Sequence, residues 1–320
     1  MFHRFASPDL GTGGHDPKLL ARALEYLRRN KYSILGLSEL LDMLGAGVEP
    51  SRNCVVFTVD DGYTDFAEVA SPVFAAYDCP VSVFLVTGFV SGVTWNWYDR
   101  VEWSFLATER KTIAIDCGAE RFAAAWSTPQ QALAASNDLV ERLKRIDDPL
   151  KESCIDATVN ALGVDVPSAA PSKYRAMTWA DVDRCARRGA TFGPHTVSHP
   201  ILSRVDATRA RREIMDSWKV LTASTSATVP VFCYPNGTGE DFSLRDEQLV
   251  AAAGLRAGVS AIEGTIDFGS RRTSRLNLLS LPRFAYSENH ERFVQIVSGL
   301  EDLKTRVVNR LERARTADRH

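Results

Sequence analysis

The sequence has no long apolar run, no excess of basic residues and no paired cysteine motif. Residues 1–5 lack the apolar stretch of about 7–15 residues that a secretory signal needs, and no stretch of about 18 apolar residues occurs. A formal net charge of −2 and a pI near 6.3 give none of the basic field that binding a phosphate backbone requires. We therefore expect a cytoplasmic protein without an integral membrane segment or a nucleic acid partner.

The six cysteines are scattered and include no Cys-x-x-Cys pair, which argues against a disulfide framework or a zinc ribbon. Of the 320 residues, 45% are hydrophobic and 24% are charged, so the chain can bury a large core. One α/β domain over residues 1–320, with an insertion, fits this length.

Helical and strand-like periodicities alternate along most of the chain, as in strands joined by crossover helices. Asp16 and Thr178 stand where helix N-caps are expected. A polar helix over residues 289–320 is expected to end the chain. Strands are expected at 54–59, 81–86, 190–192, 229–234, 256–262 and 278–285. Roughly six or seven strand–helix repeats favour a barrel.

The pattern changes over residues 92–172, where an aromatic cluster precedes helical stretches around 119–162. We expect an insertion here, because loops of such length usually carry structure of their own. The aromatic side chains can form a stacking wall for a sugar ring, or they can pack the insertion's own core. These side chains are Trp95, Trp97, Tyr98 and Trp103.

Two adjacent carboxylates, Asp60 and Asp61, follow the predicted strand at 54–59. Their mutual repulsion must be offset by a positive group, and a bound divalent cation would supply one. Neighbouring side chains of an extended chain point in different directions, so one carboxylate can bind the metal while the other faces the substrate. The alternative is a helix N-cap with an acidic first turn, since Asp61 precedes a helix.

His195 and His199 lie four residues apart beyond a short predicted strand, between Pro194 and Pro200. The prolines exclude a regular helix through the pair, so a coiled loop must bring the two rings together. Imidazole nitrogen suits zinc and similar metals, and the pair can bind one cation. Two structural histidines are the alternative, although two of the chain's six fall in this one loop.

Both segments follow predicted strands, and in a barrel the active residues gather at the C-terminal ends of the strands. Two histidines and one aspartate leave metal positions open for water and substrate, as a catalytic site needs. The pattern therefore predicts metal-assisted hydrolysis, in which Asp60 accepts a proton from the water that attacks a carbonyl carbon.

Three segments resemble motifs of the polysaccharide deacetylase (NodB-homology, carbohydrate esterase family 4) family. Residues 58–62, Thr-Val-Asp-Asp-Gly, resemble its Thr-Phe-Asp-Asp-Gly motif. Residues 195–199, His-Thr-Val-Ser-His, match its His-Ser/Thr-x-x-His motif, and residues 232–237 resemble its third motif. The resemblance implies a distorted (β/α)7 barrel that covers about 1–91 and 173–290.

The resemblance also implies residue roles. Asp60 is the base, and Asp61 binds one divalent ion together with His195 and His199. The ion is expected to be zinc, with cobalt, nickel and manganese as alternatives. The loop after the third motif's strand lines the groove and helps to hold the oxyanion; its residues here are Tyr234, Pro235 and Asn236.

The chain departs from the family pattern at three places. Phe232 stands where an arginine that orients the catalytic aspartate is common, and Asn236 stands where an aromatic residue is common. The late Leu-x-x-His motif, which supplies the acid histidine, is replaced by Leu281-Pro282-Arg283. The general acid and the partner of Asp60 must therefore come from elsewhere.

The amino-terminal segment offers a replacement acid. Phe2-His3-Arg4 is similar to a Tyr-His segment that reaches the site in some members, so His3 is the candidate acid. Arg283 or Arg4 is the candidate partner of Asp60. Surface or structural roles remain open for all three.

The sequence thus predicts a cytoplasmic N-deacetylase whose substrate is an acetylated amino sugar, as in a precursor of a surface polysaccharide. One alternative keeps the barrel and the metal but removes a formyl group or cleaves another amide. The other alternative is a sugar-binding protein without turnover.

Overall fold

The computed structural model describes residues 1–50, 53–268, 276–301 and 304. Its strands are β1 (Ser33–Ile34), β2 (Cys54–Val55), β3 (Phe57–Val59), β4 (Val81–Leu85), β5 (Thr112–Cys117), β6 (Glu120–Ala125), β7 (Ala190–Pro194), β8 (Val231–Cys233) and β9 (Ala257–Val259). Its α-helices are α1 (Pro17–Arg29), α2 (Leu37–Ala46), α3 (Ser71–Ala76), α4 (Thr87–Val90), α5 (Trp97–Ala107), α6 (Pro129–Leu143), α7 (Asp148–Leu162), α8 (Trp179–Ala186), α9 (Ala207–Ser224), α10 (Leu244–Ala252) and α12 (His290–Val297). Short turns of other helix types are η1 (Phe66–Ala70), η2 (Ser172–Tyr174), η3 (Leu202–Arg204) and η4 (Leu278–Ser280).

Parallel strands form the centre of the larger part of the molecule, by which we mean the described residues outside 97–162. β3, β4 and β7 pair with β4 in the middle, so that Val81 lies opposite both Phe57 and Ala190. β8 pairs with β9, and β1 pairs with β2, also in parallel. Every residue of β3, β4, β8 and β9 is buried, as expected of apolar runs covered on both faces. The predicted α/β class is confirmed.

Isolated backbone contacts connect these sheets to one another, to residues 1–2 and to residues 281–286. Met1 exchanges hydrogen bonds with residues 284–286. Within the described residues the assigned strands form separate sheets of two or three strands, and no single sheet closes into a barrel. The connecting parallel bridges are Phe2 to Val59, Phe192 to Thr228, and Val259 to Leu281.

Two of the expected strands differ from the prediction. The run 54–59 is divided at Val56 into β2 and β3, which pair with different partners, β1 and β4. The segment 278–285 contains the turn η4 and contributes the single bridge at Leu281. Pro282, which follows that bridge, has no N–H to continue a ladder.

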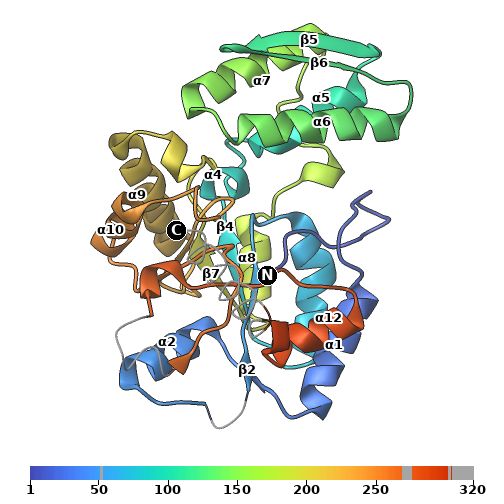
Figure 1. The fold of residues 1–320 in the computed structure, drawn as a ribbon. Coiled ribbons are helices and arrows are strands. Elements are labelled where there is room, and N and C mark those ends of the chain that lie inside the picture. Colours follow the sequence, from blue (N-terminus) through green and yellow to red (C-terminus); the bar gives the residue numbers. More distant parts are fainter. Residues whose placement is uncertain (51–52, 269–275, 302–303, 305–320) are drawn as a thin grey trace, which may run out of the picture.

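Two helices begin at the N-caps that the sequence indicates. The side chain of Asp16 accepts a hydrogen bond from the N–H of Lys18 at the start of α1, and Thr178 forms a capping box with Asp181 at the start of α8. In Figure 1, α1 and α12 lie on one side of the strands, and α9 and α10 lie on the other. These helices cover the strands and leave the strand ends to form the site.

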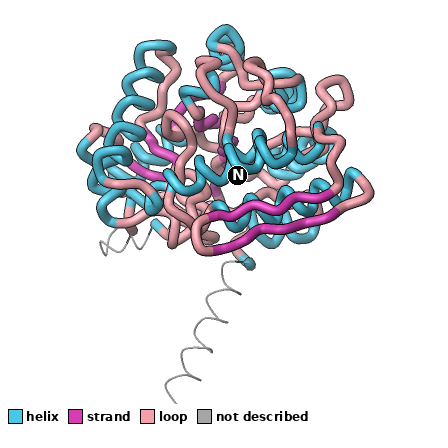
Figure 2. Tube along the Cα trace, turned by 90° about the horizontal axis from the view of Figure 1, so that it is seen from above, coloured by secondary structure: helices cyan, strands magenta, loops and turns pink. Residues whose placement is uncertain are grey.

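Residues 97–162 form a small lobe at one end of the strands (Figure 1). The lobe contains α5, α6, α7 and the antiparallel hairpin of β5 and β6, which runs along the outer side of the helices (Figure 2). Helices were predicted here, but the hairpin was missed, although residues 112–117 alternate with the strand period of two. The lobe has its own buried core, made by Trp97, Val101, Phe105, Ile113, Ile115, Phe122, Trp126, Ala132, Leu139, Leu143, Cys154, Ile155 and Leu162.

The described part of the chain contains only the first part of the predicted carboxyl-terminal helix. α12 covers the first turns of the predicted helix over 289–320, while residues 302–303 and 305–320 lie outside the described residues. Of the helices described, none combines the length and the apolar character that crossing a bilayer needs.

Candidate functional site

The predicted site residues lie where the strands of the larger part end. Asp60 follows β3, His195 follows β7 and Tyr234 follows β8. They line a cavity of about 520 Å³, whose opposite wall belongs to the small lobe. The sequence-predicted residues on this cavity are His3, Arg4, Asp60, Asp61, Trp97, Tyr98, His195, His199, Tyr234 and Asn236.

Asp61, His195 and His199 bring three potential ligand atoms together. Oδ1 of Asp61 lies 3.6 Å from Nε2 of His195 and 3.6 Å from Nε2 of His199. These separations are too long for hydrogen bonds. Ligands about 2.0–2.1 Å from a tetrahedral zinc ion, however, are about 3.3–3.4 Å apart. The spacing of these three buried residues therefore fits one divalent cation.

Both imidazole rings are held in the neutral form that binds a cation. Nδ1 of His195 lies 2.7 Å from the carbonyl oxygen of Cys233, so this nitrogen donates its proton there and Nε2 keeps its lone pair toward Asp61. Burial lowers the pKa of His195. Burial, together with the neighbouring His195 ring, lowers the pKa of His199 well below its usual value.

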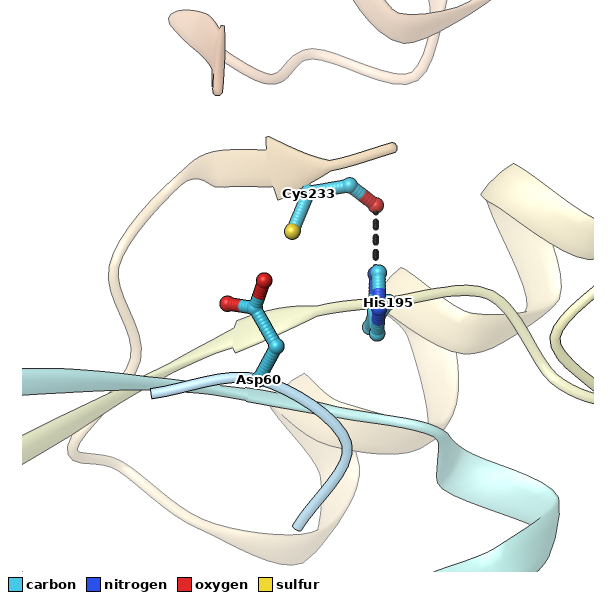
Figure 3. A group of neighbouring side chains, drawn as sticks. All are labelled: Asp60, His195 and Cys233. Carbon is cyan, nitrogen blue, oxygen red and sulfur yellow. Dashed lines mark hydrogen bonds between the residues drawn. The ribbon is translucent and has the colours of Figure 1, made fainter. Parts of the chain in front are cut away.

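Asp60, His195 and Cys233 form a second group of potential ligand atoms (Figure 3). The carboxylate of Asp60 is already paired with Arg283, and burial raises the pKa of the Cys233 thiol well above its usual value. A protonated thiol and a charge-paired carboxylate are poor metal ligands. The group around Asp61 is therefore the better candidate metal site.

Asp60 forms a bidentate ion pair with Arg283. Nη1 and Nη2 of Arg283 lie 2.8 Å and 2.9 Å from Oδ1 and Oδ2 of Asp60. Nε of the same guanidinium donates to the carbonyl of Ser260 at 2.7 Å, which fixes its orientation. Of the two arginines considered from the sequence, Arg283 contacts Asp60, whereas Arg4 pairs with Asp65 at 2.6 Å.

The two adjacent carboxylates have opposite electrostatic surroundings. Burial disfavours the charge of Asp60, but attraction to Arg283 outweighs this effect and holds the pKa of Asp60 well below its usual range. Burial, with repulsion from Asp60, raises the pKa of Asp61 to about 6. Asp60 is thus ionised by a side-chain partner, while Asp61 gains most from a cation bound beside it.

Four residues of the site have left-handed backbone conformations. Asp61, Thr196, His199 and Asn236 have φ of 75°, 67°, 58° and 61°, and they are four of the six non-glycine residues with positive φ in the described chain. This conformation is unusual for a β-branched residue such as Thr196 and costs about 1–3 kcal/mol. Surrounding contacts must therefore hold the loops in place.

Glu213 of α9 holds the histidine loop, which we define as residues 195–199. Its Oε2 accepts hydrogen bonds from the N–H groups of Val197 and Ser198 at 2.9 Å and 3.0 Å, and its Oε1 accepts from the Ser198 hydroxyl at 2.7 Å. Gly88 packs against another side of this loop. A Cβ at position 88 would lie 2.6 Å from the carbonyl oxygen of Val197, so a larger residue would clash there. Sequence reasoning missed Glu213, because a single acidic residue in a charged helix gives no local signal.

The loop after β8 is held by Asp241, whose Oδ2 accepts from the side-chain amide of Asn236 at 2.6 Å. Of the residues predicted to hold the oxyanion, Pro235 has no N–H, and the N–H of Tyr234 donates to the carbonyl of Val259 at 3.2 Å. The backbone N–H of Asn236 is therefore the remaining candidate donor from this loop.

His3 lies beside Asp60. Nε2 of His3 is 3.8 Å from Oδ2 of Asp60, and 51% of the His3 side chain is exposed. The segment is held in place because the N–H of Asp60 donates to the carbonyl of Phe2 at 2.9 Å. His3 is therefore close enough to exchange a proton in the cavity through one water, and its role as the acid stays a prediction.

Trp97 touches the cavity, but most of its side chain is packed in the lobe core. It is 4% exposed, and its indole N–H donates to the carbonyl of His199 at 3.2 Å. These contacts favour the packing role over the stacking wall. The open part of the lobe wall comes instead from α6 and the residue after it, which sequence reasoning missed; the side chains are Asn137, Val140, Glu141 and Lys144.

Comparisons with known proteins relate the chain to deacetylases. The family model described as Polysaccharide deacetylase matches residues 133–258. The match contains both histidines and the loop after β8, and it begins beyond Asp60 and Asp61. YxkH of Bacillus subtilis (strain 168), named as a polysaccharide deacetylase, is 34% identical over 87 residues, which are 27% of this chain and 30% of that protein. The chain thus matches less than a third of this relative's length.

Solved structures of similar fold come from several bacteria. The Streptococcus pyogenes deacetylase PplD, in complex with acetate, is 19% identical with a TM-score of 0.58, over 93% of this chain and 96% of that one. A de-N-acetylase from Aggregatibacter actinomycetemcomitans is 13% identical with a TM-score of 0.54, over 91% and 97% of the two chains. IcaB from Ammonifex degensii is 14% identical with a TM-score of 0.51, over 93% of each chain. At these identities the similarity shows the fold alone.

Proposed function

We propose that the chain belongs to the polysaccharide deacetylase family, whose model matches residues 133–258, and that it is a metal-dependent hydrolase that removes acetyl from an amino sugar. The ligand geometry carries the proposal: Oδ1 of Asp61 lies 3.6 Å from Nε2 of both His195 and His199, beside a carboxylate that Arg283 keeps ionised. An N-deacetylase needs a carbonyl-polarising centre and a base side by side, and this pair of carboxylates supplies positions for both.

The proposal includes a distorted (β/α)7 barrel with residues 92–172 inserted into a single domain over residues 1–320. Parallel pairing from β3 through β4 to β7, and from β8 to β9, supports it. The bridges at residues 228 and 281, and the contacts of residues 1–2 with 284–286 and with β3, support the proposed closure between these sheets. The separate core of the small lobe supports the insertion.

Asp61, His195 and His199 are the proposed ligands of the cation. Two imidazoles and a carboxylate suit zinc first, with cobalt, nickel or manganese as alternatives. When bound, such a cation polarises the acyl carbonyl and lowers the pKa of water.

The proton transfers are assigned to the chain's own groups. Asp60 accepts the proton of the attacking water, while the N–H of Asn236 donates to the carbonyl oxygen as it gains negative charge. The departing nitrogen must receive a proton, because an amine leaving as its anion is far too basic at neutral pH. His3 or the protonated Asp60 donates it, and the ion pair with Arg283 makes a protonated Asp60 a ready donor.

Product release and metal content test the proposal together. Purified protein is expected to bind one divalent cation per chain and to release acetate from N-acetylated hexosamines or their oligomers. A cytoplasmic precursor of a surface polysaccharide remains the substrate that the sequence predicts. Formate released from N-formyl sugars would instead identify another acyl group, and sugar binding without any release would identify a binding protein.

The variant His199→Ala isolates the metal site, and His290→Ala on exposed α12 is its control. We expect His199→Ala to lose the cation and the control to retain it, both measured by elemental analysis of the purified proteins. Full occupancy in His199→Ala would contradict the ligand assignment.

A further inference from the structure

The histidine loop is held by two elements that are distant in sequence. Glu213 of α9 binds the backbone N–H groups of Val197 and Ser198. Trp97 of the small lobe donates its indole N–H to the carbonyl of His199 at 3.2 Å. One holder thus belongs to the larger part and the other to the small lobe.

Two charged residues of α7 connect these holders. Oδ1 of Asp148 lies 2.5 Å from Nζ of Lys151, and that ammonium lies 4.8 Å from the centre of the Trp97 ring. Oδ2 of Asp148 lies 2.7 Å from Nη1 of Arg209, whose Nε is 3.8 Å from Oε1 of Glu213. The contacts therefore run from Glu213 to Trp97 through Arg209, Asp148 and Lys151.

The burial of this pair is unusual. The side chains of Asp148 and Lys151 are 1% and 4% exposed, although neither lines the cavity among the described residues. Burying two charges costs several kcal/mol per ion before pairing, so such a pair is poor evidence of a gain in stability. Side chains of the same volume without charge would pack a lobe equally well. What the charges of Asp148 and Lys151 provide beyond packing is the contacts with Arg209 and Trp97.

We propose that Asp148 and Lys151 are positioning residues for the histidine loop, and that they act through Trp97 and Arg209. The proposal rests on the proposed function in one respect, because it takes the loop to carry metal ligands. The small lobe then has two tasks: it forms the far wall of the cavity, and its docking fixes the carbonyl of His199 and thereby the imidazole. Partners that orient ligands in this way typically change metal affinity about 10–100-fold when removed.

The variants Lys151→Met and Trp97→Phe test the two links. Lys151→Met removes the ammonium but keeps a long apolar stem, and Trp97→Phe keeps a ring but removes the indole N–H. Lys151→Arg restores the charge and is expected to recover most of the lost affinity. Arg142→Met, which breaks the exposed ion pair with Asp138 on α6 of the same lobe, is the matched control.

Two readouts separate positioning from general stability. In the cobalt-loaded protein we expect the dissociation constant of Co²⁺ to rise about 10-fold or more and the visible spectrum of the ion to shift, in both test variants and not in the control. Without metal, we expect hydrogen exchange at the N–H groups of Val197 and Ser198 to become faster. A lower melting temperature with unchanged exchange and unchanged cobalt affinity would overturn the proposal.

The outcomes also distinguish this proposal from the proposed function. Wild-type protein that binds no cobalt would contradict the metal site, while the exchange measurement would still decide whether Lys151 and Trp97 hold the loop. Wild-type cobalt binding that both test variants match would contradict the positioning role alone.

Discussion

The two walls of the cavity are built in different ways. On the larger part, Asp60 is buried and bound at both oxygens by Arg283, and Asp61 faces two buried histidines. On the small lobe, the side chains of Asn137 and Glu141 are exposed. The wall with the candidate chemistry is thus buried and fixed by the ion pair of Asp60 with Arg283, whereas the facing wall exposes polar side chains that can contact a substrate.

The difference follows from where each wall comes from. Strand ends in the larger part place carboxylates and imidazoles next to buried backbone, so each polar group needs a partner. In the small lobe, α6 packs one stripe into the lobe core and turns another toward the cavity, with residues spaced three and four apart. The core stripe is Ala132, Ser136, Leu139 and Leu143, and the cavity stripe is Asn137, Val140, Glu141 and Lys144.

The variant Asp60→Asn is expected to have the largest effect, because it removes the base from the fixed wall. The amide keeps an oxygen for Arg283 but cannot accept the water's proton, so kcat should fall about 10²–10⁴-fold while the cation is retained. Acetate release and elemental analysis measure the two quantities. Asp246→Asn, which alters a buried carboxylate paired with Arg245 outside the cavity, should leave kcat unchanged. Near-normal turnover in Asp60→Asn would mean that the base lies elsewhere.

The variant Arg283→Met tests how the fixed wall sets the protonation of Asp60. Arg283 holds the pKa of Asp60 well below its usual range, and burial alone would raise it. The base must be ionised, so without Arg283 we expect the acid limb of kcat/KM to move to higher pH. Removing one partner of a buried ion pair also costs about 3–5 kcal/mol of stability, so melting temperature is followed beside the pH profile.

Arg245→Met is the control for Arg283→Met, because it also breaks an arginine–aspartate pair but lies outside the cavity. It should leave the acid limb in place. An acid limb that does not move in Arg283→Met would show that Asp60 does not titrate in the reaction.

The pairing of Asp60 also shows what the sequence could and could not provide. The adjacent aspartates and the two histidines were recognisable because each motif is local, and the N-caps at Asp16 and Thr178 were local too. The choice between Arg283 and Arg4 was not, because only the fold brings residue 283 to the end of β3. Sequence patterns specify neighbours along the chain, whereas buried charge pairs join its distant parts.

The small lobe was harder to predict than the larger part. Its hairpin has short alternating strands, and neighbouring helical patterns dominate the same region. The sequence suggests Trp97 as part of a sugar-stacking wall, yet its ring is buried and its indole N–H donates a hydrogen bond to the carbonyl oxygen of His199. An aromatic residue has the same sequence signal in a core as in a binding site, and only packing separates the two.

The variant His3→Ala probes the edge between the two walls. His3 lies 3.8 Å from Asp60 and is half exposed, so it can reach both a water and the departing amine. We expect kcat to fall about 10–10²-fold without loss of the cation, which is at or below the usual range of general-acid effects, because protonated Asp60 can still donate. His15→Ala, which removes a half-buried histidine beside Glu288, is the control. Unchanged kcat in His3→Ala would assign the proton donation to Asp60 alone.

The variant Lys144→Ala tests the small-lobe wall and is expected to have the smallest effect. Lys144 lines the cavity and forms a 2.6 Å ion pair with exposed Glu141, so its ammonium can contact a sugar only at the solvent-facing side. An exposed charged contact is worth about 0.2–1 kcal/mol, which corresponds to a rise in KM of up to about fivefold. Because a contact remote from the reacting bond binds ground and transition states alike, kcat should stay constant. Arg142→Ala, on the face of α6 that does not line the cavity, should change neither constant. A fall in kcat for Lys144→Ala would instead place this lysine near the reacting acyl group. The small-lobe wall would then take part in the reaction and not only in substrate binding.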